Sequence, residues 1–330
     1  LCANTEGLNN TAIGHLALRQ NTTADNNVAV GMSALLANTT GTRNVAVGCG
    51  ALASNVDDND NTAIGFDALT VNTGQNNTAL GTCALRGNQT ANDNTGIGMR
   101  SLFTNTTGAA NTGLGFSALK ANTTAAGNTA VGTNSLCSNE TGFNNTAVGN
   151  CSGNDVTTGD CNTYIGAFAA YQATTGNNNT AVGDQALSLM TTASDNTAVG
   201  RSALKANTTG CQNVSLGTES LKGNLTGDGN VAIGHLALFT NNGSTPDFNV
   251  AVGRQALYST TSGYRNVALG LNAMYTTTTG YANVGIGSNV LYSNTTGYEN
   301  VAIGQCALYA NISGVENTAI GCGALRSSQT

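Results

Sequence analysis

Hydrophobic and polar residues follow a pattern that repeats every 17 residues along the whole chain. Each copy carries the core Asn-[Thr/Val]-Ala-[Val/Ile/Leu]-Gly, with some variation at the alanine. With the glycine numbered zero, an aliphatic residue recurs at position −1 and a leucine at most positions +4, as in Val30 and Leu35. A period this strict indicates a stack of similar units rather than a globular core with a pocket. The core glycines are Gly14, Gly31, Gly48, Gly65, Gly81, Gly98, Gly115, Gly132, Gly149, Gly166, Gly183, Gly200, Gly217, Gly234, Gly253, Gly270, Gly287, Gly304 and Gly321.

Positions −4 to 0 predict a short strand, because they are rich in β-branched residues and contain no charged side chain in any copy. We expect the −1 and +4 columns to form the core, each side chain stacking on its equivalent one coil away. A strand with one solvated face normally shows polar residues there, and this one does not. Its second face is therefore expected to be covered, either within a narrow coil or by a partner chain, and we favour the partner.

The rest of each repeat, for example residues 202–210, begins with good helix formers and ends in Asn-Thr-Thr-Gly. The first half predicts either a single helical turn or a second short strand, and the second half predicts a turn. The asparagine at −4 is expected to bond turn backbone and to stack as a ladder. The fold class predicted is all-β: a solenoid of 19 coils with 17 residues per coil.

Residues 1–330 are interpreted as one solenoid domain, because the period is unbroken. The spacing departs from 17 only twice, with a step of 16 after Gly65 and a step of 19 after Gly234. Both changes are expected in the exposed turn, and the longer one falls in residues 240–247, which hold the single proline. Because the sequence starts and stops within a repeat, we expect it to be a segment of a longer chain.

Composition narrows the function further. Charged residues make up 8% of the chain and the net charge is −6, with lysine and arginine scattered. Nucleic-acid binding, which needs clustered basic charge, is disfavoured. No apolar run approaches the ~20 residues of a membrane span. The two histidines, His15 and His235, are many coils apart, so His-based catalysis and metal sites within one chain are not expected. We predict a non-enzymatic protein without a cofactor.

Asparagine sequons recur at position +7, in the turn predicted to be exposed. An exposed turn is where a glycan can be attached and solvated, although Asn, Thr and Gly also produce sequons simply as common turn residues. The candidates for glycosylation are Asn21, Asn38, Asn88, Asn105, Asn122, Asn139, Asn207, Asn224, Asn294 and Asn311.

Nine cysteines are present, and two pairs are candidates for disulfides. Cys306 and Cys322 lie on adjacent coils at nearly the same phase, within reach of a bridge. Cys151 and Cys161 flank the most irregular repeat, where a bridge would offset a lost leucine. The alternative is that each is a small buried or surface residue.

Tyrosines repeat at the 17-residue period in two columns near the C-terminal end. Lysine and arginine occupy the first column elsewhere, so it is expected to be exposed. Exposed aromatics could bind sugars or another subunit, and the alternative is stacking that only stabilises the coils. The first column is Tyr258, Tyr275, Tyr292 and Tyr309, and the second is Tyr264, Tyr281 and Tyr298.

The core Asn-Asn-Val-Ala-Val-Gly at residues 26–31 resembles repeats in the heads of trimeric autotransporter adhesins. The longer unit at residues 304–311 is similar to repeats in phage tail fibres and large surface proteins. The resemblance implies a parallel β-solenoid, often trimeric, that serves as an adhesin or fibre shaft. The adhesin repeat is shorter than 17 residues, and no anchor, stalk or cleavage domain lies within this sequence.

The expected function is that of a structural or adhesive extracellular fibre at a cell or virion surface. It would self-associate as a filament or homotrimer, and glycans would coat it or be its ligands. One alternative is a trimeric adhesin or tail-fibre shaft that carries a separate binding tip. Another is an ice-binding solenoid, which is disfavoured because threonine fills only part of the −3 column.

Overall fold

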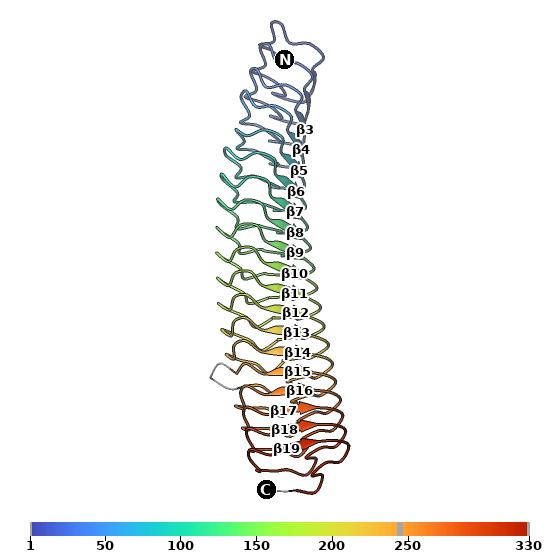
Figure 1. Cartoon of the computed structure of the whole chain (residues 1–330). Coiled ribbons are helices and arrows are strands. Elements are labelled where there is room, and N and C mark those ends of the chain that lie inside the picture. The colour runs from blue at the N-terminus through green and yellow to red at the C-terminus, as the bar shows by residue number, and fades with distance from the viewer. Residues whose placement is uncertain (1, 243–246, 329–330) are drawn as a thin grey trace. The chain divides into compact units, whose positions relative to one another are not determined.

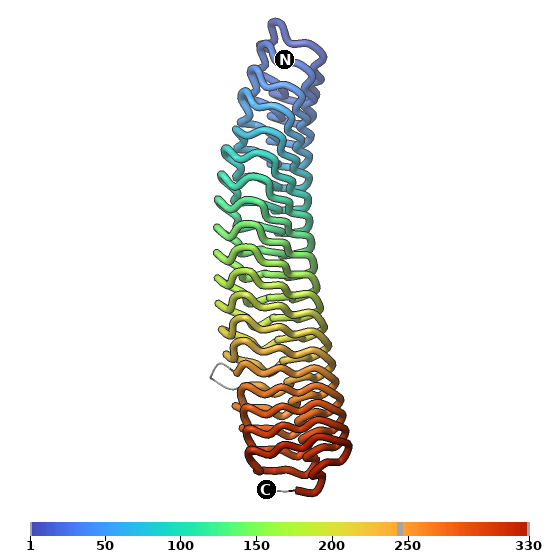
Figure 2. The backbone as a smooth tube through the Cα atoms, in the orientation of Figure 1, coloured from blue at the N-terminus to red at the C-terminus, as the bar shows by residue number. Residues whose placement is uncertain are grey.

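The computed structural model describes residues 2–242 and 247–328. They fall into two compact units, Leu1–Asn162 and Thr163–Thr330. Within each unit the chain winds in coils that lie one against the next, and each coil contributes one short strand (Figure 1, Figure 2).

Unit 1 contains nine strands of three residues that pair in parallel and in register. Val28 pairs with Val45, for example, so one turn of the solenoid takes 17 residues. The strands are β1 (Thr11–Ile13), β2 (Val28–Val30), β3 (Val45–Val47), β4 (Thr62–Ile64), β5 (Thr78–Leu80), β6 (Thr95–Ile97), β7 (Thr112–Leu114), β8 (Thr129–Val131) and β9 (Thr146–Val148).

Unit 2 repeats this arrangement with ten strands. Val231 of one strand pairs with Val250 of the next, so register survives the 19-residue step between them. The strands are β10 (Thr163–Ile165), β11 (Thr180–Val182), β12 (Thr197–Val199), β13 (Val214–Leu216), β14 (Val231–Ile233), β15 (Val250–Val252), β16 (Val267–Leu269), β17 (Val284–Ile286), β18 (Val301–Ile303) and β19 (Thr318–Ile320).

Both units are therefore parallel all-β solenoids, as the period predicted. Residues 243–246 of the predicted insertion lie outside the described residues. The expectation of one domain over residues 1–330 stays a prediction.

The core differs from the prediction in one column. The leucine at +4 is buried as expected, but the second inward residue is the small one at −2, such as Ala29, and not the aliphatic residue at −1. A three-residue strand turns only its middle side chain inward. A Cβ atom added to Gly96 at −2 would lie 3.1 Å from Cγ of Leu85, so a coil with leucine at +4 has room only for a small side chain there. Tyr164 of β10 is the large exception: it is fully buried at −2, where the +4 residue of the preceding repeat is Gly153 instead of leucine. The prediction that −1 belongs to the core is wrong.

The segment after the strand is neither a helical turn nor a second strand in the described residues. It is a series of turns in which positions +2 and +4 take left-handed backbone, as at Ser33 (φ 60°) and Leu35 (φ 50°). Gly31 at position zero has φ 133°, a region essentially restricted to glycine. Because +2 and +4 interrupt right-handed backbone, a helix cannot form.

The asparagine ladder predicted at −4 is confirmed. Asn44 is buried, its backbone N–H donates to Oδ1 of Asn27 at 2.9 Å, and its Nδ2 donates to the carbonyl of Asp58 at 2.8 Å. One side chain thus joins its own coil and the neighbouring coil.

Candidate binding surfaces

The outward face of the strands recurs in every coil of each unit. Positions −3 and −1 point away from the core, and the −1 residues Ile64, Leu80 and Leu114 are 38%, 44% and 42% exposed. No charged residue occupies either column in any coil. The face is therefore a repeated, in-register surface of Thr, Val, Ile and Leu.

In unit 1, large apolar residues directly after the strands add to the exposed apolar surface. Met32, Phe66, Met99 and Phe116 stand at position +1 and are between 43% and 53% exposed. The corresponding residues of unit 2 include Asp184, Arg201 and other polar residues, so the larger apolar surface belongs to unit 1. Contiguous apolar patches on soluble proteins commonly mark interaction sites.

The ten glycosylation candidates lie in a place that the sequence did not indicate. All ten side chains are fully buried, because position +7 points into the coil and not into the exposed turn. Nδ2 of Asn38 donates to Oδ1 of Asn21 at 3.1 Å and to the carbonyl of Gly41 at 2.9 Å. The prediction that these asparagines are exposed is wrong. Their side-chain nitrogens donate hydrogen bonds inside the coil, where the +7 asparagines form a second ladder. The candidates that are buried instead of exposed are Asn21, Asn38, Asn88, Asn105, Asn122, Asn139, Asn207, Asn224, Asn294 and Asn311.

Neither predicted disulfide is present, because all nine cysteines are free thiols in the structure. In unit 2, Cys306 and Gly323 occupy the same repeat position on adjacent coils, and the N–H of Gly323 donates to the carbonyl of Gln305 at 2.8 Å. Cys322 therefore lies one position away from the residue that is opposite Cys306. In unit 1, Cys151 lies at +2 and Cys161 in the opposite part of the repeat, where its N–H donates to the carbonyl of Phe143 at 3.0 Å.

Both tyrosine columns form continuous stacks. Successive rings from Tyr258 to Tyr309 lie 5.0 to 5.2 Å apart and nearly parallel, and Phe239 extends the stack by one ring at 5.1 Å. Tyr264, Tyr281 and Tyr298 stack at 4.9 and 4.7 Å. Because neighbouring rings cover one another's faces, inner tyrosines offer a ligand only their edges and hydroxyls. This geometry favours the stabilising interpretation over sugar stacking on ring faces.

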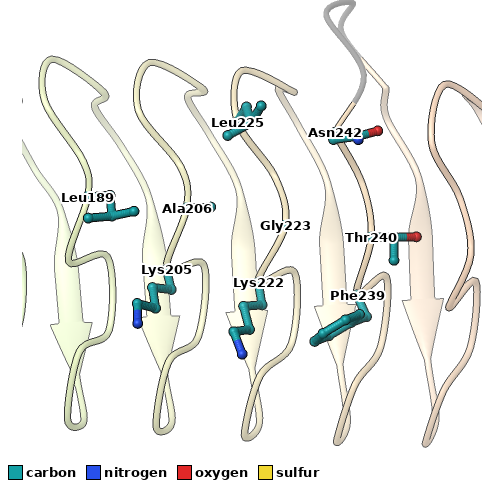
Figure 3. A pocket seen from close by; sticks show the side chains of 9 residues that line it. All are labelled: Leu189, Lys205, Ala206, Lys222, Gly223, Leu225, Phe239, Thr240 and Asn242. Carbon is teal, nitrogen blue, oxygen red and sulfur yellow. The ribbon is translucent and has the colours of Figure 1, made fainter.

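Phe239, the first ring of the longer stack, also borders a groove in unit 2 of about 510 Å³. Figure 3 shows Lys205, Lys222 and Phe239 in a row on successive coils, with Gly223 and Thr240 beside them. Nζ of Lys222 lies 5.6 Å from the centre of the Phe239 ring, within the range of a cation–π interaction. The sequence singled out the tyrosines but missed this groove, which a glycine at position +6 marks.

No protein-family model matches the chain, and a search of curated proteins finds no match either.

His15 and His235 are both exposed and belong to different units. Within residues 2–242 and 247–328, no group of three His, Cys, Asp or Glu side chains is arranged to hold a metal ion. The same residues contain no helix that is long and apolar enough to cross a membrane.

Proposed function

We propose that this chain is a non-enzymatic structural and adhesive shaft of an extracellular fibre at a cell or virion surface. The observation that carries the proposal is the outward strand face, which is free of charge and repeats in register within each of the two units. A soluble enzyme or monomeric scaffold has no need to keep such a face free of charge in every coil.

The partner proposed for this face is a second copy of the chain. Side chains on stacked strands recur at the ~4.8 Å strand spacing, and a surface with the same spacing can interdigitate with them coil by coil. Two outward residues on each of nine strands, together with the apolar +1 residues of unit 1, approach the ~20–30 residues per side of a stable interface. Self-association as a filament or homotrimer follows from this match.

A trimeric adhesin or tail-fibre shaft with a separate binding tip remains the alternative form of the same proposal. It differs in assembly, because three chains would enclose their strand faces instead of adding chains without limit. Glycans are proposed as ligands of the shaft and not as a coat on its buried +7 asparagines.

The test combines light scattering with electron microscopy of native protein and two triple variants. Ile97→Lys, Leu114→Lys and Val131→Lys place charges on the outward face of three successive strands. Thr107→Lys, Thr124→Lys and Thr141→Lys place the same charges on exposed turns of the same coils. We expect the native protein and the turn variant to assemble and the strand-face variant to stay folded but monomeric. A native protein that is monomeric at every concentration, or a strand-face variant that assembles normally, would refute the proposal.

Ice binding is a second candidate that one observation favours. Six successive strands of unit 1, β4 to β9, place a threonine on the exposed face next to an aliphatic residue, as Thr62 stands beside Ile64. The −3 column is therefore more regular in this part than over the whole chain. Thermal hysteresis measured on the strand-face variant and the native protein tests this, and its absence in concentrated native protein excludes it.

A further inference from the structure

The groove beside Phe239 has a counterpart in unit 1. A second groove, of about 360 Å³, is bordered by Arg86, Gly87, Phe103 and Thr104. Each of these occupies the repeat position of its equivalent in unit 2, where the groove is bordered by Lys222, Gly223, Phe239 and Thr240. The same arrangement of cation, glycine, phenylalanine and threonine thus occurs once in each unit.

The repeat positions show that the two grooves share one sequence signature. Gly87 and Gly223 are the only glycines at +6 among all coils, and Phe103 and Phe239 are the only phenylalanines at +5. Each phenylalanine directly follows the coil that carries the glycine. Stability alone does not require this pairing, since the neighbouring coils hold Val, Ala or Thr at +6 in the same fold.

The glycine forms the floor of each groove. The N–H of Gly87 donates to the carbonyl of Phe103 at 3.0 Å, and that of Gly223 donates to the carbonyl of Phe239 at 2.9 Å. A Cβ atom on Gly87 or Gly223 would lie 2.9 or 2.8 Å from the same carbonyl oxygen. A side chain here would push outward into the space that the groove now leaves open.

Threonine has the same role in both grooves. The hydroxyl of Thr104 donates to the carbonyl of Lys120 at 2.8 Å, and that of Thr240 donates to the carbonyl of Tyr258 at 2.8 Å. Both hydroxyls are therefore engaged with backbone. The lining formed by glycine, threonine and a phenyl ring is mainly apolar.

Cations outnumber carboxylates around both grooves. Near Phe103 the guanidinium carbons of Arg86 and Arg100 lie 5.9 and 6.0 Å from the ring centre, and Asp67 contacts Arg86 at 3.8 Å.

In unit 2, Nζ of Lys222 contacts Glu219 at 3.3 Å, and Nζ of Lys205 donates to Oε1 of Gln185 at 2.6 Å. Glu219 also contacts Arg201 at 3.4 Å. In a chain with 11 Lys and Arg residues and a net charge of −6, this concentration of cations stands out and would attract an anion.

We propose that the two grooves are equivalent binding sites for an acidic saccharide, one site in each unit. A pyranose ring has an apolar C–H face, which fits the apolar lining, and a carboxylate on the ring is complementary to the Arg and Lys side chains. The groove volumes are in the range of small-ligand sites. This inference rests on the adhesive part of the function proposed above and names the ligand class and its two sites.

The test is isothermal titration calorimetry of the full chain with the trimer of galacturonic acid. The fully methyl-esterified trimer keeps the rings without the charge, and an oligoglutamate of equal charge keeps the charge without the rings. We expect two trimers bound per chain, and at least ten-fold weaker binding of both comparison ligands. Equal binding of the oligoglutamate would overturn the saccharide assignment.

Variants locate the sites. Gly87→Leu alone is expected to reduce the stoichiometry from two to one, and Gly87→Leu with Gly223→Leu to abolish binding. Ser138→Leu places a leucine at +6 of a coil that borders neither of the two grooves, and this variant should bind two trimers. If the leucine variants do not fold, the double variant Arg86→Gln with Lys222→Gln tests the cations instead, because both side chains are exposed enough to tolerate the change. This variant is expected to bind the trimer at least ten-fold more weakly. Unchanged affinity and stoichiometry in the folded variants would refute the proposal.

The same samples are examined for assembly by electron microscopy, which separates the two proposals. A native chain that assembles but binds no trimer refutes the saccharide sites and leaves the fibre standing. A chain that binds two trimers but never assembles refutes the fibre and leaves the sites.

Discussion

Nδ2 of Asn122 donates a hydrogen bond of 2.7 Å to Oδ1 of Asn105, which lies 17 residues earlier. The same nitrogen donates to the carbonyl of Ala125 at 3.0 Å, and both asparagine side chains are fully buried. The amide group of Asn122 therefore holds its own turn closed and also bonds the coil before it, as that of Asn139 does in the next coil. In a narrow solenoid, such bonds replace part of the packing that a wide core would supply.

Asn122→Ala should destabilise unit 1, because it leaves Oδ1 of Asn105 and the carbonyl of Ala125 without these donors inside the protein. We expect a loss of about 1–3 kcal/mol in the free energy of unfolding, measured by urea denaturation. Asn150→Ala removes the same group at an exposed position and should change it by less than ~0.5 kcal/mol. Equal losses in the two variants would show that the ladder adds nothing.

Leu119 combines full burial with left-handed backbone at φ 52°. An L-residue pays about 1–2 kcal/mol for this conformation, from which glycine is exempt. Leu119→Ala loses about 2–5 kcal/mol of burial and keeps the strain, whereas Leu119→Gly loses the burial and relieves the strain. We therefore expect the glycine variant to be at least as stable as the alanine variant in thermal unfolding.

The control for this comparison is Ala118, a buried neighbour outside the left-handed region. Ala118→Gly should show the ordinary penalty of about 0.5–1 kcal/mol. A glycine variant at 119 that is clearly less stable than the alanine variant would mean that the leucine conformation carries no strain.

The regular columns of the sequence were sufficient to predict the solenoid, its period and the strand at each core. They were insufficient to assign the strand faces, because Ala29 and Val30 are both apolar and either could point inward. The width of the coil decides which of the two points inward. That width depends on the left-handed turns at +2 and +4, and a leucine such as Leu35 gives no sign in the sequence that its backbone is left-handed. The sequence wrongly predicts that the +7 asparagines are exposed for the same reason. An asparagine in a turn can bond the previous coil or face solvent, and the residues around it are the same in both cases.

The corrected strand faces lead to opposite expectations for neighbouring residues of one strand. Val131 points outward and Ala130 is fully buried against the leucine column. Val131→Ser should change the free energy of unfolding by less than ~0.5 kcal/mol in the monomer. Ala130→Val should cost about 1–3 kcal/mol by overpacking. Thermal unfolding of both variants checks this, and a larger loss at Val131 would restore the −1 column to the core.

Asp58 stands at position +10, where Gly41 and Ala91 show the usual small residues. It is 9% exposed, and its Oδ2 has no hydrogen-bond partner among the residues that the structure describes. Burial, and secondarily the charge of Asp57, raise the pKa of this carboxyl above its ordinary value. The folded chain therefore binds a proton that the unfolded chain has already lost over part of the acid range.

The raised pKa fixes the sign of the pH dependence. The stability that protonated Asp58 contributes is complete below the unfolded pKa of ~3.9 and is lost as pH rises through the folded pKa. Asp58→Asn, which cannot ionise, should therefore raise the unfolding temperature at pH 7, with a gain that shrinks towards zero near about pH 3. Glu140→Gln removes a charge at an exposed position and should show no such pH-dependent gain. A gain for Asp58→Asn that is the same at both pH values would show that the amide stabilises through shape or hydrogen bonding, because relief from a buried charge must vanish once the native carboxyl is protonated.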